Sequence, residues 1–181
     1  MRIRFWPFFL IWVVSLFSIS CCLRQGELKD RFNLTEEDIE RIPYENGDIL
    51  NFIHSEGFQF ECTIRTENFF SSTQEACEDY FENEVFSAFF ESDIPSLNIE
   101  LQLSKFIGGD STFFGISSDF TSFILEQQSP QIIIINGVEY NDVETYFSSN
   151  ETYFIENILY NSTIGILKIN YKDNSYVEIL P

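Results

Sequence analysis

The chain has 181 residues and a formal net charge of −19, and it contains 21 Phe and 8 Tyr. This length suits one domain, and an acidic surface of this kind disfavours nucleic acid as a partner because it repels phosphate groups. The abundance of aromatic residues excludes low-hydrophobicity disorder for most of the chain.

The first twenty residues have the layout of a signal peptide. Arg2 and Arg4 precede an uncharged run, and the strongly apolar part of that run, Phe5–Phe17, has the length of a signal core. The small residues of Ser18–Ser20 then lead directly to Cys21. We therefore predict that residues 1–20 are a signal peptide and that the mature protein is exported.

The cysteine pair at the end of this segment is typical of a lipid attachment site. A bacterial lipobox usually has Leu three residues before the modified cysteine, where Cys21 has Ser18 and Cys22 has Ile19. Cys21 follows the small residues, so we predict that Cys21 carries the lipid, with Cys22 as the alternative. Ordinary cleavage directly before Cys21 and an uncleaved anchor that runs to Leu23 remain open.

Residues 21–43 are charged and differ from the rest of the chain. The stretch "TEED" can cap a brief helix that ends at Pro43. We predict that residues 21–43 form a tether with a short N-terminal helix. Residues 44–181 are expected to form a single antiparallel β domain, because their turn signals are those of hairpins.

The first predicted hairpin surrounds "SEG" at residues 55–57. A two-residue turn at residues 56–57 would pair Ile53 with Phe60 and would gather apolar side chains on one face. We disfavour a three-residue loop because it would bury His54 without an obvious partner. The disfavoured register would place on one face Leu50, Phe52, His54, Phe58 and Phe60.

The middle of the chain predicts further strands. Residues 97–103 alternate strictly between apolar and polar side chains, which is typical of a strand with one buried face. The aromatic segment of residues 76–92 fits either a helix or a strand, and we interpret it as a strand. The dipeptide Asn136-Gly137 is a strong hairpin signal, which predicts that Ile135 pairs with Val138 and Ile133 with Tyr140.

The last hairpin can be registered by comparing turn lengths. A two-residue turn at residues 173–174 would place Ile169 opposite Glu178 and would mix the two faces. A three-residue loop at residues 172–174 pairs Ile169 with Val177 and Lys168 with Glu178. We therefore predict the three-residue loop.

The ending "LYNSTIGILKINYKDNSYVEIL", the hairpin "INGVEYNDV" and the lipobox-like start resemble those of small secreted lipoproteins of Bacteroidota. Domains of that family often finish with a "GIlKI…dG…eL" hairpin. The resemblance implies an envelope location and a β-rich fold, and it implies no activity. Asn174 stands where the family pattern has glycine, and Asn tolerates the same backbone conformation.

The remaining cysteines are predicted to form a disulfide. Cys62 and Cys77 lie in the exported part, where thiols oxidise, and a bridge between them would contribute ~3 kcal/mol in the chain-entropy model. His54 is interpreted as a solvated hairpin residue, because the preferred register places it and Cys62 on opposite faces of the hairpin. No metal or cofactor is expected, because the chain has neither CxxC nor clustered histidines.

These observations predict an all-β protein with minor α content, whose hairpins form a bent sheet, a sandwich or a partial barrel. No catalytic residue is recognised. We expect a lipid-anchored protein of the bacterial cell envelope that acts as a non-catalytic binding or accessory module for an envelope protein or a glycan. The alternative is a carboxylate-dependent hydrolase, such as a glycan-active enzyme. Two facing carboxylates with raised pKa values would indicate the enzyme, and an aromatic face would indicate binding.

Overall fold

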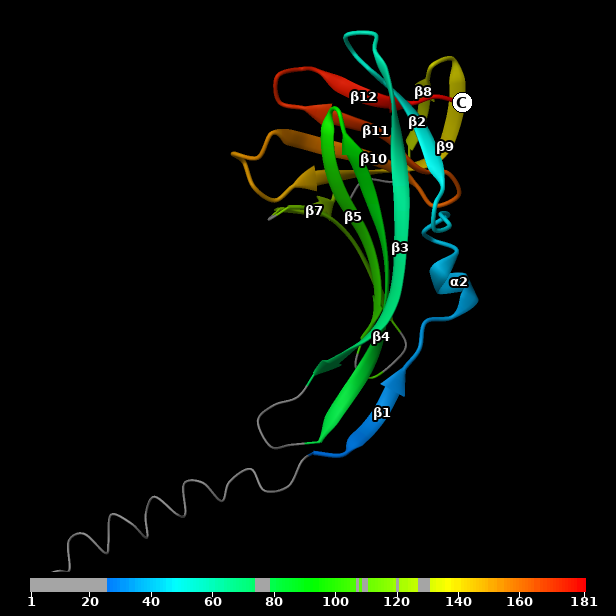
Figure 1. Cartoon of the computed structure of the whole chain (residues 1–181), viewed down its shortest axis with the longest axis vertical. Helices are drawn as coiled ribbons and strands as arrows, with labels where there is room; N and C mark the ends of the chain where they lie inside the picture. The colour runs from blue at the N-terminus through cyan, green and yellow to red at the C-terminus, as the bar shows by residue number, and fades with distance from the viewer. Residues whose placement is uncertain (1–25, 74–78, 107, 109–110, 120, 127–130) are drawn as a thin grey trace, which may run out of the picture.

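The computed structural model describes residues 26–73, 79–106, 108, 111–119, 121–126 and 131–181. Ten antiparallel strands form a closed barrel (Figure 1), because β4 pairs with β5 as well as with β3. The all-β class is confirmed. The bounds are β2 (Ile49–His54), β3 (Gln59–Thr73), β4 (Tyr80–Asp93), β5 (Ser96–Lys105), β6 (Thr112–Ser118), β7 (Thr121–Leu125), β9 (Val138–Ser148), β10 (Ile155–Asn161), β11 (Gly165–Tyr171) and β12 (Tyr176–Ile179).

The bent sheet and the sandwich that we expected are wrong, and the barrel is closed rather than partial. Closure depends on pairing between β2 and β12, which lie at opposite ends of the domain's sequence. In that pairing Phe52 lies opposite Ile179, and His54 lies opposite Val177. The alternation of apolar and polar residues identifies the buried face of a strand but not the strand that pairs with it. The pairing of β2 with β12 therefore cannot be predicted from the sequence pattern.

The hairpin at Asn136-Gly137 is confirmed. Both residues have positive φ angles, 51° and 80°, as a two-residue hairpin turn requires. The predicted pairs Ile135–Val138 and Ile133–Tyr140 are both present. This hairpin joins β8 (Gln131–Ile135) to β9, and β8 lies outside the barrel path.

The C-terminal hairpin also has the predicted register. Ile169 pairs with Val177, and Lys168 pairs with Glu178. The Lys168 Nζ atom lies 2.6 Å from Glu178 Oε1, so the cross-strand charge pair is formed. Asn174 has a φ angle of 69°, which is the left-handed conformation expected there.

The predicted register of the first hairpin is wrong. Phe60 pairs with Phe52 rather than with Ile53, so the loop has three residues. This register places Leu50 and Phe52 toward the barrel interior and leaves Ile49 exposed. The imidazole of His54 stacks on the Phe58 ring with centroids 4.6 Å apart, so the histidine has a partner that we did not anticipate.

The strand predicted for residues 97–103 is confirmed, and so is the strand assignment of the aromatic segment, which forms β4. Phe90 on β4 pairs with Ile99 on β5, and both side chains are fully buried. Their face is the inner face of the barrel, and large apolar residues from the other wall pack against it. These include Tyr160, Ile158, Ile166, Leu167 and Ile169.

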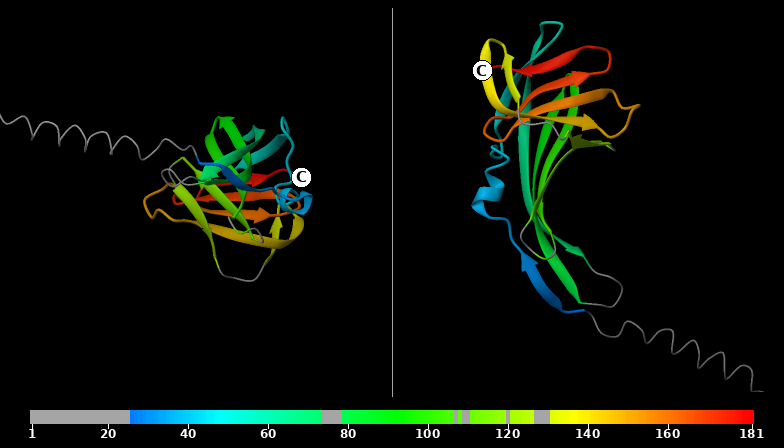
Figure 2. Two further views of the ribbon diagram at one scale, coloured as in Figure 1. Left: turned by 90° about the horizontal axis from the view of Figure 1, so that it is seen from below. Right: turned by 180° about the vertical axis from the view of Figure 1, so that it is seen from behind.

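Part of the predicted tether is a strand, β1 (Leu28–Phe32), which pairs in parallel with the start of β4. Below the barrel, β3 and β4 continue as a long curved ribbon that β1 borders (Figures 1 and 2). The expected N-terminal helix is reduced to a single turn, α2 (Glu36–Ile39), which Thr35 caps. Among the described residues, no helix is long and apolar enough to span a membrane.

The segment after α2 enters the barrel core. Tyr44 is buried and packs edge-on against Phe90, with ring centroids 4.9 Å apart. The Tyr44 hydroxyl accepts a hydrogen bond of 2.7 Å from the backbone N–H of Ile166. The Tyr160 hydroxyl donates to the backbone carbonyl of Arg41. The segment between α2 and β2 therefore packs against the barrel core and is not a free tether.

Candidate functional site

Two of the predicted site residues, Cys21 and Cys22, lie outside the described residues. Cys77 also lies outside them, and the predicted Cys62–Cys77 disulfide is not found. Cys62 is fully buried with a free thiol, and burial raises the pKa of that thiol to about 12. The continuous strand β3 carries the chain from Cys62 to Thr73, roughly 36 Å at ~3.3 Å per residue, away from the buried thiol.

His54 and Cys62 share the inner face of the barrel, contrary to the prediction that they lie on opposite faces. Cys62 pairs with Leu50, so His54 is four residues farther along β2. At ~3.3 Å per residue this offset is roughly 13 Å, which is too far for a thiol–imidazole pair. The described residues therefore hold no Cys–His nucleophile.

Three cavities in the described part of the molecule lie outside the packed barrel core. One of about 370 Å³ lies between hairpin loops and includes His54, Phe154 and Tyr171. Another, of about 380 Å³, lies beside α2 and includes Glu37, Glu40 and Arg41. The largest of the three, about 470 Å³, is a groove on the outer face of β3, β4 and β5. Its size lies within the ~300–1,000 Å³ range of small-molecule sites.

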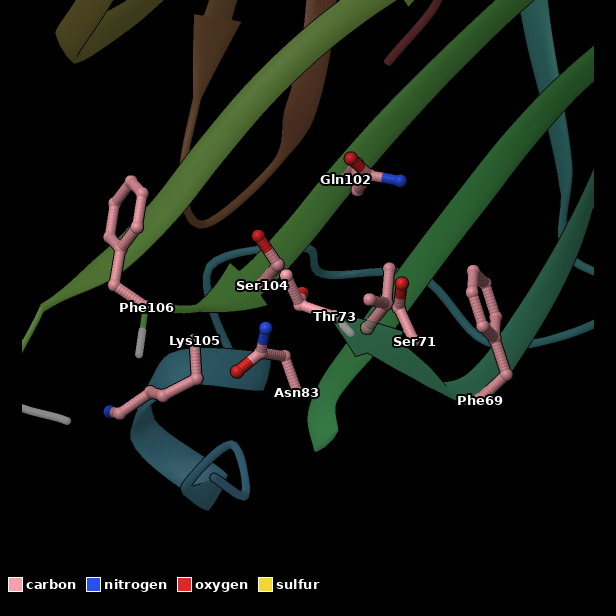
Figure 3. Close-up of a pocket in the computed structure, with 9 residues that line it drawn as sticks. Phe69, Ser71, Thr73, Asn83, Gln102, Ser104, Lys105 and Phe106 are labelled. Atoms are coloured by element: carbon pink, nitrogen blue, oxygen red, sulfur yellow. The ribbon is translucent and has the colours of Figure 1, made fainter. Parts of the chain in front are cut away.

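The groove on β3–β5 has aromatic walls. Phe69 on β3 stands on one side, 45% exposed, and Phe106 follows β5 on the other, 53% exposed (Figure 3). Phe113 on β6 supports Phe106 in an edge-to-face contact with centroids 6.1 Å apart. A β carbon at Gly115 would come within 2.7 Å of the Phe113 ring, so glycine leaves room for that ring to lie along the strand.

The spacing between the walls follows from the strand register. Phe69, Val85, Ser104 and Phe113 are successive cross-strand neighbours on β3 to β6. Neighbouring strands lie ~4.8 Å apart, so the Phe69 and Phe113 backbones are separated by about 14 Å. Val85 and Ser104 lie between them as part of the floor.

The floor of the groove is polar and contains a buried acceptor without a donor. Asn83 Oδ1 is buried, and no described residue donates a hydrogen bond to it. A buried acceptor without a donor costs about 1–3 kcal/mol, so the site is favourable for a group that can donate. The remaining polar side chains of the floor are Ser71, Thr73, Gln102 and Ser104 (Figure 3).

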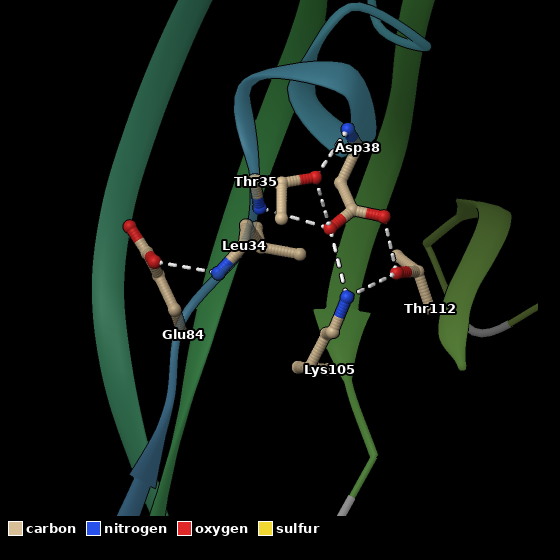
Figure 4. A network of polar contacts seen from close by, with 6 residues as sticks. All are labelled: Leu34, Thr35, Asp38, Glu84, Lys105 and Thr112. Atoms are coloured by element: carbon tan, nitrogen blue, oxygen red, sulfur yellow. Dashed lines mark hydrogen bonds and ion pairs between the residues drawn. The ribbon is translucent and has the colours of Figure 1, made fainter. Parts of the chain in front are cut away.

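The groove carries no free charge among its described lining residues. These include no Asp or Glu, and Lys105 is the single basic residue. The Lys105 ammonium lies 2.9 Å from Asp38 Oδ2 (Figure 4). Lys105 follows Ser104 on β5, so strand alternation directs its side chain away from the face that carries Gln102 and Ser104. The ion pair neutralises the lysine, so the groove presents amides, hydroxyls and aromatic rings in an otherwise strongly acidic protein.

Asp38 and Asp173 are unsuited to the role of a general acid at neutral pH. Burial opposes the ionisation of Asp38, but hydrogen bonds from Thr112, Thr35 and Lys105 outweigh it and hold the pKa of Asp38 well below its usual range. Hydrogen bonds from Ser175 lower the pKa of Asp173. A general acid needs a raised pKa instead. In the described part of the chain, no cluster of three or more His, Cys, Asp or Glu residues could hold a metal ion.

The sequence did not identify this groove. Its walls and floor come from β3, β4, β5 and the segment after β5, and their apposition depends on the barrel register. One signal was visible: Gln102 and Ser104 are uncharged on the solvent face of the predicted strand, where an acidic protein would ordinarily place charges. The exposure of Phe69, Phe106 and Phe113 was not predictable, because the neighbouring phenylalanines of β4 are half-buried and Phe90 is fully buried.

Comparison of the chain with models of protein families, with curated proteins and with solved structures finds no match. The candidate site therefore rests on the geometry of the molecule itself.

Proposed function

We propose that this protein is a non-catalytic binding module of the bacterial cell envelope and that the groove on β3–β5 is its ligand site. The observation that carries the proposal is a polar floor, with the buried and unpartnered acceptor Asn83 Oδ1, between exposed aromatic walls. Binding requires only such a surface, whereas glycoside hydrolysis requires two carboxylates across a cleft. The described lining of the groove has none.

A turnover screen tests the proposal. The full-length chain in mild detergent is incubated with glycan, ester and peptide substrates, and products are measured by mass spectrometry. We expect product to form no faster than in buffer alone, because the groove offers no general acid. Turnover that disappears when one Asp or Glu is replaced, with the fold retained, would support the hydrolase alternative instead.

The proposed location is the cell envelope, with a lipid on Cys21 as the membrane attachment. Support comes from the apolar run, the small residues before Cys21 and the resemblance to secreted lipoproteins. The first described residue, Gly26, comes two residues before β1, which lies at one end of the molecule (Figure 1). Cys21 lies five positions before Gly26, a distance of at most about 18 Å along the chain. A lipid on Cys21 would therefore hold the β1 end close to the membrane.

Intact mass spectrometry of the protein extracted from its native envelope tests the lipid. We expect a mature chain that begins at Cys21 and carries additional acyl mass. A Cys21→Ala variant is expected to lose that mass, whereas Cys22→Ala, the matched control, is expected to keep it. A chain that still begins at Met1, or one that begins at Cys21 without acyl mass, would contradict the proposal.

A further inference from the structure

The groove on β3–β5 has features that select one chemical class of ligand. Resting on the proposed binding function, we infer that the groove binds a neutral glycan, with a sugar ring lying between Phe69 and the Phe106–Phe113 pair. The inference depends on three independent properties of the groove, namely its walls, its floor and its charge.

The walls suit the apolar face of a sugar. A pyranose ring presents C–H groups on its faces and hydroxyl groups around its edge, so exposed aromatic rings can cover a face while the edge stays polar. Phe69 and Phe106 are about half exposed and stand on opposite sides of the groove (Figure 3). The backbone separation of about 14 Å across β3 to β6 leaves space for a ring between the side chains.

The floor suits the hydroxyl groups of the same ligand. A sugar hydroxyl can donate one hydrogen bond and accept others, which matches an array of amides and hydroxyls. Asn83 Oδ1 lacks a donor among the described residues, and a ligand hydroxyl would supply one. Gln102 Nε2 lies 3.4 Å from Glu100 Oε1, which leaves the Gln102 oxygen as an additional acceptor.

The described lining of the groove offers no free charge to bind an anionic or a cationic ligand. Anionic glycans would meet a protein of net charge −19 without a free cation in the groove, because Lys105 is paired with Asp38. A cationic ligand would find no carboxylate among the described lining residues. The remaining class that matches both the aromatic walls and the polar floor is a neutral polyhydroxylated molecule.

The inference is tested by affinity electrophoresis and calorimetry of the full-length chain in mild detergent. The probes are neutral polysaccharides (glucans, mannan, xylan and galactan), two anionic ones (polygalacturonate and heparin) and an apolar peptide mixture. We expect binding to at least one neutral polysaccharide. Phe69→Ala and Asn83→Ala are each expected to weaken it at least about tenfold, which corresponds to about 1.4 kcal/mol.

The control variant is Phe154→Ala, which removes an aromatic side chain that is 51% exposed in a different cavity. It is expected to leave glycan binding unchanged. Asn83→Ala also separates a ligand role from a structural one. Because Asn83 Oδ1 has no described partner, we expect this variant to unfold at the same denaturant concentration as the wild type or a higher one.

Three outcomes would overturn the inference. If neutral polysaccharides bind the Phe69→Ala and Asn83→Ala variants as tightly as the wild type, the groove is not the binding site. If none of the neutral polysaccharides binds, a neutral glycan is not the ligand of the groove. In the third outcome the protein binds only the anionic polysaccharides or the peptides, with weaker binding by the Phe69→Ala and Asn83→Ala variants. That result would contradict the neutral glycan as ligand but would support the proposed binding function of the groove.

Discussion

Replacing Gly165 with alanine is expected to lower the free energy of unfolding by about 4 kcal/mol, a large fraction of the ~5–15 kcal/mol typical of a domain. Gly165 has a φ angle of 96°, where an L-residue costs about 1–2 kcal/mol. A β carbon there would also overlap the hydroxyl and ring of Tyr44. Overpacking of a core adds about 1–3 kcal/mol.

The effect is large because displacing the Tyr44 side chain would break contacts that it makes in the core. Its ring packs against Phe90, and its hydroxyl accepts the N–H of Ile166. Burial raises the pKa of Tyr44 well above its usual range, in keeping with an enclosed site. An alanine at position 165 would displace the segment that closes the barrel beside β11.

Gly47→Ala provides a matched control for this prediction. Gly47 also has a positive φ angle, 93°, but a β carbon there would meet nothing within 4 Å. We expect the free energy of unfolding of this variant to fall only by the cost of the backbone conformation, about 1–2 kcal/mol. Guanidinium unfolding of the full-length chain in mild detergent, followed by far-UV circular dichroism, measures both. Equal losses in the two variants would contradict the packing of Tyr44 over Gly165.

Replacing Asp38 with asparagine is expected to cost about 2 kcal/mol at pH 7, because hydrogen bonds to a charged group contribute about 1.5–3 kcal/mol each. Asp38 accepts from Lys105 Nζ at 2.9 Å and from the Thr35 backbone at 2.9 Å, and Thr112 also donates to it (Figure 4). These contacts join α2 to β5 and β6. Lys105 and Asp38 are 13% and 16% exposed, so solvent screens their attraction only in part.

The pH dependence of this effect has a definite sign. The pKa of Asp38 is lower in the folded protein than its ordinary value of 3.8. Its contribution to stability is therefore fully present above about pH 4 and is lost as the pH falls from there toward the folded-state pKa. The difference between wild type and Asp38→Asn should shrink in that acidic range, because the Asp38 carboxyl of the unfolded wild-type chain takes up a proton there, whereas asparagine does not titrate.

Unfolding curves at pH 7 and at pH 3 measure the effect. Asp93→Asn is the matched control, because Asp93 is exposed and its side chain makes no hydrogen bond or ion pair with the described residues. We expect the control to change stability by less than about 0.5 kcal/mol at either pH. An Asp38→Asn difference that stays constant between pH 7 and pH 3 would show that the carboxylate charge does not hold α2 in place.

The predicted effect of Asp38 also concerns the groove. Lys105 belongs to the strand that carries Gln102 and Ser104, and its ammonium is held on the inner side of the sheet by Asp38. Loss of that carboxylate would leave an unpaired cation beside the groove. Asp38→Asn is therefore expected to increase the affinity of anionic polysaccharides for the protein relative to neutral ones.

Several local features were determined by the sequence alone. The strict alternation of residues 97–103 identified the buried face of β5, because a strand places successive side chains on opposite faces. Asn136-Gly137 set the β8–β9 register, since both positions need positive φ angles. The C-terminal register followed from combining the Lys168–Glu178 charge pair with apolar packing. In each case signals within one strand or one hairpin were sufficient.

The first hairpin shows why a local pattern can fail. Residues 49–54 are apolar on both faces, with Ile49 and Ile53 on one side and Leu50 and Phe52 on the other. Alternation could not choose between them, and we disfavoured burying His54. The pairing of β2 with β12 decided the register, because it places Phe52 opposite Ile179 inside the closed barrel.

The candidate site depended wholly on tertiary structure. Its walls and floor come from Phe69, Asn83, Gln102 and Phe106, which are separated in sequence and become neighbours only through the strand registers. Local propensity acts over a few residues and so determines strands and turns. Three features depend on contacts between segments that are distant in the sequence: the closure of the barrel, the packing of the N-terminal segment against its core, and the groove on its outer face. Only the packing of the whole chain selects such contacts.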